Sequence, residues 1–277
     1  MFSLKTLSRI LPLITTREYS LSVDNVKITK IGRVTCLGLN RPQNKNCLNV
    51  ELLKQLTFTL EAFQNDQNSL AGVLYGEQGN FSYGFDHSEI KENLQNVQLL
   101  LQDITSQYSK KPLIAAVSGF AVGAGFDLAL WCDFRIVEET AVIATYSRNF
   151  GVPVSDAAAK RLCLLVGTHR ALDWVLTGRI VKAKEALDCG IATRVVACGT
   201  GLGQAVNFAS SLCNMPQACL KADRASILSI SHRFLTEQVK TEIIREQEEN
   251  MKIALMEAMQ GIHQTESGDV RRKDNTS

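Results

Sequence analysis

One carboxylate stands in the interior of the most apolar stretch of this 277-residue chain, residues 110–133, which ends at a second one, Asp133. Asp127 has Phe126, Leu128 and Trp131 as near neighbours in sequence. Burial among such residues disfavours the charged form and raises a carboxyl pKa toward the range in which it can accept and release a proton. The residue type and its surroundings therefore predict a general acid–base group. The alternative is that Asp127 only compensates the dipole in the first turn of a helix.

The glycine-rich segment before Asp127 predicts a second chemical feature. Pro112–Val117 has the pattern of a short buried strand, Ser118–Gly123 that of a loop, and Ala124–Cys132 that of a buried helix. A strand that leads through such a loop into a helix leaves backbone N–H groups unpaired at the helix start. We expect a site for an oxyanion there, with Asp127 about one turn into the helix.

Three other interpretations of this stretch are weaker. About 20 apolar residues span a bilayer, but the glycines at 119, 123 and 125 and the carboxylate at 127 argue against a transmembrane helix. The glycine spacing is Gly-x-x-x-Gly-x-Gly, which differs from the Gly-x-Gly-x-x-Gly of dinucleotide-binding folds, and no early βαβ unit precedes it. No Gly-x-Ser-x-Gly segment of a serine hydrolase is present in the chain.

Composition excludes several function classes. The chain is 45% hydrophobic and 21% charged with a net charge of +2, which is ordinary for a globular protein and gives no electrostatic signature of nucleic-acid binding. The eight cysteines form no Cys-x-x-Cys pair and the four histidines no His-x-x-x-His pair. We expect reduced thiols, no metal site and no insertion into a membrane.

The first residues differ from the rest. Met1–Tyr19 contains Lys5, Arg9 and Arg17, several hydroxyl residues and no acid before Glu18, with apolar residues at helical spacing. This pattern favours a mitochondrial transit peptide, which we place at residues 1–20, and hence a matrix location. The alternative is an N-terminal extension without a targeting role.

Hydrophobic periodicity and turn residues predict the elements that position these groups. Expected strands are Val23–Ile31, Val34–Leu39, Ala71–Tyr75, Pro112–Val117, Phe134–Val137, Val142–Ala144 and Ile191–Val196. Expected helices are Val50–Gln64, with Asn49 as its cap, Glu89–Tyr108, Ala124–Cys132, Ala157–Val166, Thr168–Leu176, Lys182–Asp188, Gly203–Cys213, Gln217–Ser229 and Phe234–Met259. The fold class is α/β: a core over 21–200, a helical C-terminal region over 201–260, and a disordered tail over 261–277.

Four segments, in order and at matching spacing, resemble the crotonase superfamily of enoyl-CoA hydratases and isomerases. The resemblance covers Val26 to Ser229 and rests on these segments: Asn40-Arg41-Pro42 followed by Asn46-Cys47-Leu48-Asn49; Phe81-Ser82-Tyr83-Gly84-Phe85-Asp86; residues 110–133; and Phe150-Gly151-Val152-Pro153-Val154-Ser155-Asp156. The last is similar to the Gly-Val-Pro-x-x-Asp of one branch. The resemblance implies a spiral of strand–strand–helix repeats with C-terminal helices, assembled as a homotrimer or hexamer.

The resemblance also implies the chemistry, which is stabilisation of a thioester enolate by two backbone N–H groups. By position these donors are Phe85 and Ala124, and the CoA-binding residues are Tyr83, Gly84 and Asp86. The substrate would be an acyl-CoA, with no cofactor. For the segment around Gly84, the alternative is a glycine turn that ends a hairpin.

The proton-transfer residues match the hydratase pattern less fully than the backbone donors do. Asp127 falls where hydratases carry the first of two catalytic glutamates, and Ser147 falls at the second. The Gly-Val-Pro-x-x-Asp branch offers Asp156 as the other candidate, although three alanines follow it here where the branch has Gly-Gly-Thr. Asp156 could equally cap a helix that begins at residue 157.

Two functions follow from this pattern. The first is an enoyl-CoA hydratase or isomerase of fatty-acid or related acyl-CoA metabolism. The second is a crotonase-fold protein with reduced catalysis that binds acyl-CoA or acts as a scaffold. The changes at Tyr83, Ser147 and residues 157–159 motivate the second function.

Overall fold

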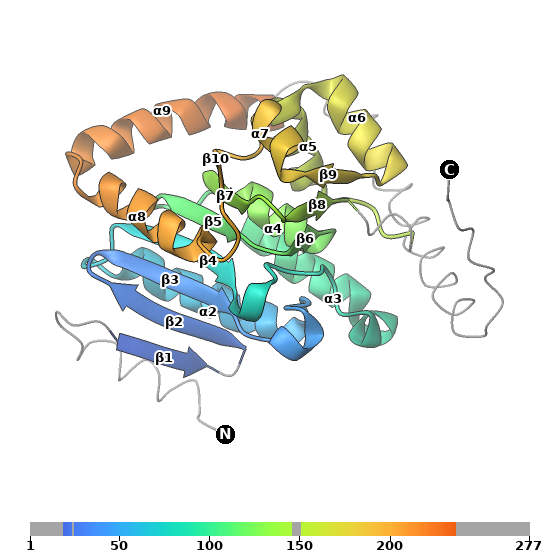
Figure 1. Ribbon diagram of the computed structural model, residues 1–277, viewed down its shortest axis with the longest axis horizontal. Coiled ribbons are helices and arrows are strands. Elements are labelled where there is room, and N and C mark those ends of the chain that lie inside the picture. The colour runs from blue at the N-terminus through green and yellow to red at the C-terminus, as the bar shows by residue number, and fades with distance from the viewer. Residues whose placement is uncertain (1–18, 24, 146–150, 237–277) are drawn as a thin grey trace.

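The computed structural model describes residues 19–23, 25–145 and 151–236, and these form two sheets with helices on both sides (Figure 1). The strands are β1 Tyr19–Val23, β2 Val26–Ile31, β3 Val34–Leu39, β4 Ala71–Gly76, β5 Leu113–Val117, β6 Phe120–Val122, β7 Phe134–Glu138, β8 Val142–Ala144, β9 Ile180–Lys182 and β10 Arg194–Val196. The helices are α2 Val50–Asn65, α3 His87–Thr105, α4 Ala124–Trp131, α5 Asp156–Val166, α6 Thr168–Thr177, α7 Ala183–Asp188, α8 Gly201–Cys213 and α9 Gln217–Thr236.

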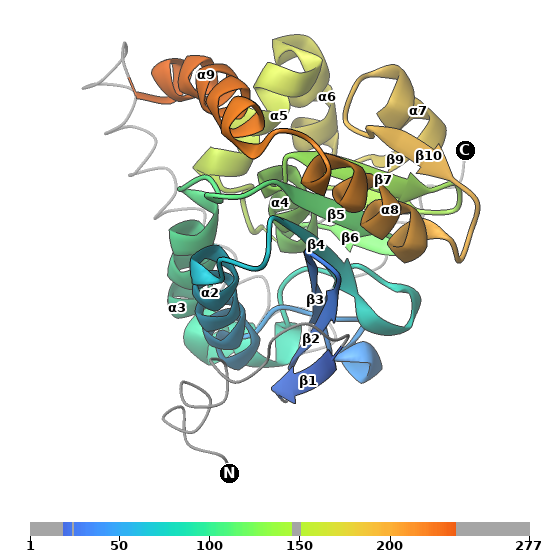
Figure 2. The same cartoon turned by 90° about the vertical axis from the view of Figure 1, so that its left-hand side faces the viewer.

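The larger sheet has the strand order β1-β2-β3-β4-β5-β7-β10. The pairs β1–β2 and β2–β3 are antiparallel, and every later pair is parallel. Strands β3, β4 and β5 are buried along their whole length. Both faces are covered because α2 packs against one side and α8 against the other (Figure 2). This double burial explains why these strands are almost continuously apolar in sequence.

The smaller sheet, in the order β6-β8-β9, holds the glycine-rich segment in place. After β5 the chain turns at Gly119, forms β6, and then passes through Gly123 into α4. Both glycines have a φ of 53°, a left-handed conformation that glycine adopts without strain. Residues 110–133 are therefore a strand, a short strand and a helix, and the described residues contain no helix long and apolar enough to cross a membrane.

Most of the predicted elements are confirmed. Asn49 caps α2, because its side-chain oxygen accepts the Leu52 N–H at 2.9 Å. Leu48 and Leu53, on either side of this cap, are fully buried. The predicted helix at Ala124 begins at that residue.

The structure differs from the predicted elements in four places. The strand expected over Val23–Ile31 is β2, which begins at Val26 and pairs with β1, a strand that was not expected. The loop expected over Ser118–Gly123 contains β6, and β9 was not expected. Helix α9 continues to Thr236, through the point where a new helix was expected to begin at Phe234. The tail over 261–277 and most of the predicted transit peptide lie outside the described residues.

Candidate active site

The candidate site is built where residues 81–86 run between two other backbone segments. On one side, Ser82 N–H donates to the Phe120 carbonyl at 2.8 Å, and Val122 N–H donates to the Ser82 carbonyl at 3.1 Å. On the other side, Leu48 N–H donates to the Gly84 carbonyl at 2.7 Å, and Asp86 N–H donates to the Leu48 carbonyl at 2.9 Å. Two of the sequence segments that carried the family resemblance, around residues 84 and 124, thus lie side by side.

This pairing leaves two backbone donors without partners. The parallel bridge to Leu48 uses the residues on either side of Phe85, so Phe85 N–H points to the opposite edge, along which residues 120–124 run. Ala124 is the first residue of α4, where an N–H has no partner within the helix. Neither N–H donates a hydrogen bond to any described residue. Their arrangement suits an oxygen that gains negative charge.

Glycine is required for the two segments to approach this closely. Gly84 has a φ of 91°, and a Cβ there would lie 3.0 Å from the Val122 carbonyl oxygen and 3.6 Å from the Ala124 nitrogen. A Cβ at Gly125 would lie 2.5 Å from the Ser82 carbonyl oxygen. A side chain at either position would push the two backbone donors apart, so the close approach requires glycine.

Asp127 lies one turn after Ala124 on α4 and is 5% exposed. Burial raises the pKa of its carboxyl to about 6, although hydrogen bonds from Ser155 and the positive charge of Arg161 oppose the rise. The closest backbone donor is Ser155 N–H, 3.3 Å from Oδ2. The structure therefore agrees with the expectation of a buried carboxylate with a raised pKa, and places it on the helix that supplies the Ala124 donor.

Ser155 is a residue of this site that sequence reasoning did not single out. Its side-chain oxygen accepts the Ala158 N–H at 3.2 Å and so caps α5, while its backbone N–H reaches Asp127. The suggestion that Asp156 caps this helix is wrong by one residue. A serine just before an alanine-rich helical run is a capping signal, but its contact with Asp127 depends on tertiary packing.

Asp156 pairs with a different residue from the one that contacts Asp127. It is the first residue of α5, its carboxylate pairs with Lys160 at 2.6 Å, and its side chain is 43% exposed. The structure thus places Asp127 against Ser155 and Asp156 against Lys160. Ser147, at the position of the second hydratase glutamate, lies outside the described residues.

The three predicted CoA-binding residues lie on the segment over 83–86. Lys45 Nζ lies 4.8 Å from the centre of the Tyr83 ring, whose edge meets Phe120. Asp86 is buried and caps α3 through the Ser88 N–H. Its Oδ2 pairs with Arg41 at 2.8 Å. Burial alone would raise the Asp86 pKa, but hydrogen bonds from Ser88, Asn44 and Arg41 lower it below its ordinary value.

Among the described residues, no group of three or more histidine, cysteine, aspartate or glutamate side chains could hold a metal ion. The eight cysteines are all free thiols. Burial raises the pKa of Cys36 to about 12 and that of Cys47 to about 11, so both stay protonated at neutral pH. The chemistry of the described site therefore rests on backbone donors and a carboxyl group.

Comparison with known proteins agrees with the geometry. The model of the enoyl-CoA hydratase/isomerase family matches residues 30–266. A probable enoyl-CoA hydratase of Rhizobium meliloti is 38% identical over 197 residues, which cover 69% of this chain and 76% of that protein. A probable mitochondrial enoyl-CoA hydratase of Dictyostelium discoideum is 30% identical over 219 residues, which cover 77% and 78% of the two chains.

Solved structures share the fold. A methylmalonyl-CoA decarboxylase in complex with 2-nitronate-propionyl-CoA superposes with a TM-score of 0.80 at 18% identity, over 92% of this chain and all of that one. The enoyl-CoA hydratase of Mycobacterium tuberculosis superposes with a TM-score of 0.67 at 28% identity, over 89% of this chain and all of that one. The crotonase-like fold expected from the sequence is confirmed.

Proposed function

This chain belongs to the enoyl-CoA hydratase/isomerase family, and from that premise we propose that it converts an enoyl-CoA thioester through an enolate, with Asp127 as the group that moves the proton. One observation carries the proposal. A buried carboxyl with a pKa of about 6 lies one helical turn from the Ala124 N–H, which has no hydrogen-bond partner among the described residues.

The two backbone donors would bind the thioester oxygen. Negative charge grows on that oxygen as the enolate forms, so the Phe85 and Ala124 N–H groups would bind the transition state more strongly than the substrate. Loss of one donor in an oxyanion hole typically costs about 3–4 kcal/mol of transition-state stabilisation. Because both donors are backbone groups, the phenylalanine and alanine side chains at these positions leave the interaction intact.

A single carboxylate can carry out both proton transfers of hydration. Asp127 takes a proton from water as the oxygen of that water bonds to the β-carbon, and the C=C electron pair moves through the α-carbon onto the thioester oxygen. The Asp127 carboxylic acid then returns its proton to the α-carbon as the enolate collapses. In isomerisation the same carboxylate takes a proton from one carbon of the acyl chain and returns it to another.

The pKa of Asp127 suits both half-reactions. With a value of about 6, the group is mostly ionised at pH 7 and can accept a proton, yet it is a strong enough base to hold that proton until the second step. A fully exposed aspartate with a pKa of about 3.9 would be a much weaker base. Asp156 is the second candidate for proton transfer, and its pairing with Lys160 makes it the lesser one.

The remaining assignments belong to the same proposal. Tyr83, Gly84 and Asp86 would line the path of CoA, with Asp86 acting through the backbone that it holds in place. The reaction as written needs no cofactor or metal. Charges on the described residues and the net charge of +2 support neither nucleic-acid binding nor membrane insertion as a function.

Assembly and location complete the proposal. We propose a homotrimer or hexamer, supported by exposed leucines at 164, 172 and 176 on α5 and α6 that would be covered in an assembly. We propose the mitochondrial matrix, supported by the basic, acid-poor residues 1–17 and by the mitochondrial relative in Dictyostelium. Size-exclusion chromatography with light scattering and imaging of a C-terminal fusion would test these two proposals.

A second candidate function is acyl-CoA binding without turnover. It is favoured by the absence of a carboxylate at Ser147 and by the engagement of Asp156 with Lys160. Purified protein, its Asp127→Ala variant and an Asp223→Ala control on exposed α9 should be assayed with 2-enoyl-CoA and 3-enoyl-CoA esters of several chain lengths. Turnover by wild type and control but not by Asp127→Ala supports the enzyme. Binding of CoA esters without turnover of any of them would support the second candidate.

A further inference from the structure

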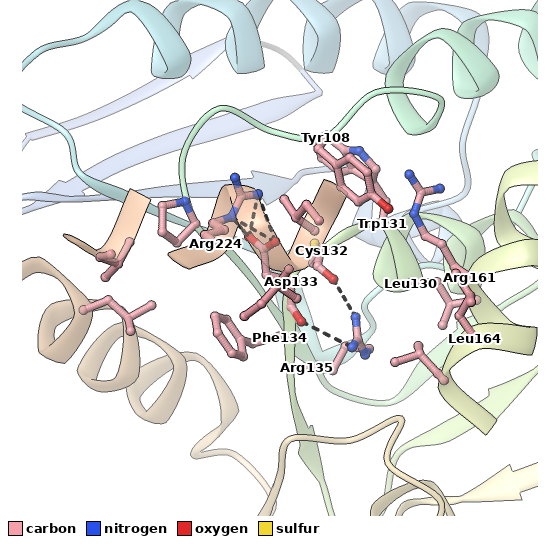
Figure 3. Close-up of a pocket in the computed structure, with 16 residues that line it drawn as sticks. Tyr108, Leu130, Trp131, Cys132, Asp133, Phe134, Arg135, Arg161, Leu164 and Arg224 are labelled. Carbon is pink, nitrogen blue, oxygen red and sulfur yellow. Dashed lines mark hydrogen bonds and ion pairs between the residues drawn. The ribbon is translucent and has the colours of Figure 1, made fainter. Parts of the chain in front are cut away.

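A cavity of about 370 Å³ lies away from the candidate active site, between α9, α5 and the segment that joins α4 to β7 (Figure 3). Its walls are mostly apolar and come from leucines of α4, α5, α8 and α9 together with Trp131, Phe134 and Ile227. This volume falls within the range of about 300–1,000 Å³ of small-molecule sites. Asp127 and the Ala124 donor lie toward the start of α4, whereas Leu130 and Trp131 of the cavity lie at its end.

Positively charged side chains outnumber negatively charged ones in the cavity wall. Three arginines and one aspartate line it, which is a formal charge of +2. Arg224 is neutralised by Asp133, since its Nη2 lies 2.9 Å from Oδ1 and 3.0 Å from Oδ2. Arg135 is buried and donates to backbone carbonyls, including those of Cys132 at 2.6 Å and Ile191 at 2.6 Å. Backbone carbonyls therefore occupy the donors of Arg135.

Arg161 is the arginine of the cavity wall whose hydrogen bonds are incomplete. It is 7% exposed and lines the cavity, and its Nη2 donates to the Thr105 carbonyl. Its guanidinium carbon lies 5.4 Å from the centre of the Tyr108 ring. Its Nε–H is buried and has no hydrogen-bond partner among the described residues. A buried donor without a partner is costly, and the cost is larger when the donor is charged.

We propose that this cavity binds a small amphiphilic carboxylate, such as a free medium-chain fatty acid, with the carboxylate on Arg161 and the hydrocarbon tail against the leucines. A carboxylate matches the planar fork of a guanidinium and would supply the missing acceptor. It would also offset the excess of positive charge. The apolar walls require the rest of the ligand to be hydrocarbon.

The proposal does not rest on the proposed function, because Phe85, Ala124 and Asp127 do not line the cavity and ligand binding can be measured without turnover. Trp131 lines the cavity, so ligand entry should change its fluorescence, whereas Trp174 does not line it. The full-length chain should be titrated with octanoate and with octanol, which has the same tail but no carboxylate. Saturable binding of octanoate at least about tenfold tighter than octanol is expected, since a charge-assisted pair is worth that much.

Two variants with exposed side chains separate this site from non-specific binding. Ile227 lines the cavity and is 66% exposed, whereas Ile180 of β9 is 52% exposed and lies outside it. Ile227→Glu should weaken octanoate binding about tenfold or more by placing a negative charge at the cavity, and Ile180→Glu should leave it unchanged. Equal binding of octanol and octanoate, no saturation, or equal loss in the two variants would overturn the proposal.

Discussion

Asp86 and Asp127 are both near the start of a helix, and their side chains are similarly hidden, with residue exposures of 6% and 5%. Their environments differ in their partners and in how deeply the carboxyl group is enclosed. Asp86 has Arg41, Asn44 and Ser88 within hydrogen-bonding distance, and its pKa is lowered. Asp127 is enclosed more deeply, accepts hydrogen bonds from Ser155 alone among the described residues, and burial raises its pKa to about 6 against the opposing charge of Arg161. The exposed fraction of the residue therefore does not decide the protonation of a carboxylate, whereas its depth of enclosure and its partners do.

Asp86 and Asp127 therefore have different roles. The charge of Asp86 is matched by Arg41, so this carboxylate holds residues 41–49 against the start of α3 and stabilises the backbone that presents the Phe85 N–H. The charge of Asp127 is left nearly unmatched, which costs stability and leaves a base free for proton transfer.

The largest expected effect is on activity at Asp127. Asp127→Asn should lower kcat/KM for an enoyl-CoA ester by about 10²–10⁴-fold, the usual contribution of a general acid–base group. The measurement is steady-state kinetics on protein shown to be folded by circular dichroism. Asp156→Asn is the matched comparison and should keep activity within about threefold. A larger loss at Asp156 than at Asp127 would reverse the assignment.

The largest expected effect on stability is at Asp86. Asp86→Ala should cost about 3–5 kcal/mol of unfolding free energy, because it leaves the buried Arg41 guanidinium without its carboxylate and α3 without its cap. Asp86→Asn keeps a capping oxygen and should lose less. Urea denaturation followed by fluorescence checks this, and a loss under about 1 kcal/mol for Asp86→Ala would show that the pair is not structural.

Asp127→Asn should have the opposite effect and stabilise the fold at neutral pH. A folded-state pKa of about 6 against an ordinary value of 3.8 means that the folded state binds this proton more tightly, so wild-type stability falls as pH rises from 3.8 to 6 and then stays level. Two pKa units correspond to on the order of 3 kcal/mol, at about 1.4 kcal/mol each. Denaturation at pH 7.5 and pH 4 should show the gain of the variant at the higher pH and little difference at the lower.

The smallest expected effect is at Ser155. Ser155→Ala removes a cap worth about 1 kcal/mol and a hydrogen bond that lowers the Asp127 pKa. The acid limb of the pH–rate profile should therefore move to higher pH. Ser155→Thr keeps the hydroxyl and should restore the limb. An unchanged limb in Ser155→Ala with the same loss of stability would mean that Ser155 acts only as a helix cap.

Local signals in the sequence were enough to predict much of the fold. Asn49 before an amphipathic run predicted the start of α2, and the glycines at 119 and 123 predicted the break before α4. The hairpin of β1 and β2 was missed because β1 overlaps the segment interpreted as a transit peptide, although Asp24 and Asn25 between the two strands are common turn residues. The short strands β6 and β9 were missed because pairing with β8, and not local propensity, makes them strands.

Part of the candidate site was also predictable from local sequence. Asp127 stands among apolar residues in sequence, so its burial and the direction of its pKa shift could be expected. The partners of Asp86 and Asp127 could not, because Arg41 and Ser155 are distant in sequence and reach these carboxylates only through tertiary packing. The cavity at Arg161 depends on α9 crossing over the end of α4, which no local pattern reveals.

Asp127 is a buried carboxyl whose pKa is raised to about 6. NMR titration of protein labelled with ¹³C at the aspartate carboxyl carbons measures this directly, with Asp127→Asn used to assign the resonance. A midpoint of about 6 is expected for Asp127, and the Asp86 resonance should titrate below the ordinary aspartate value. A midpoint for Asp127 at or below 4 would contradict the account.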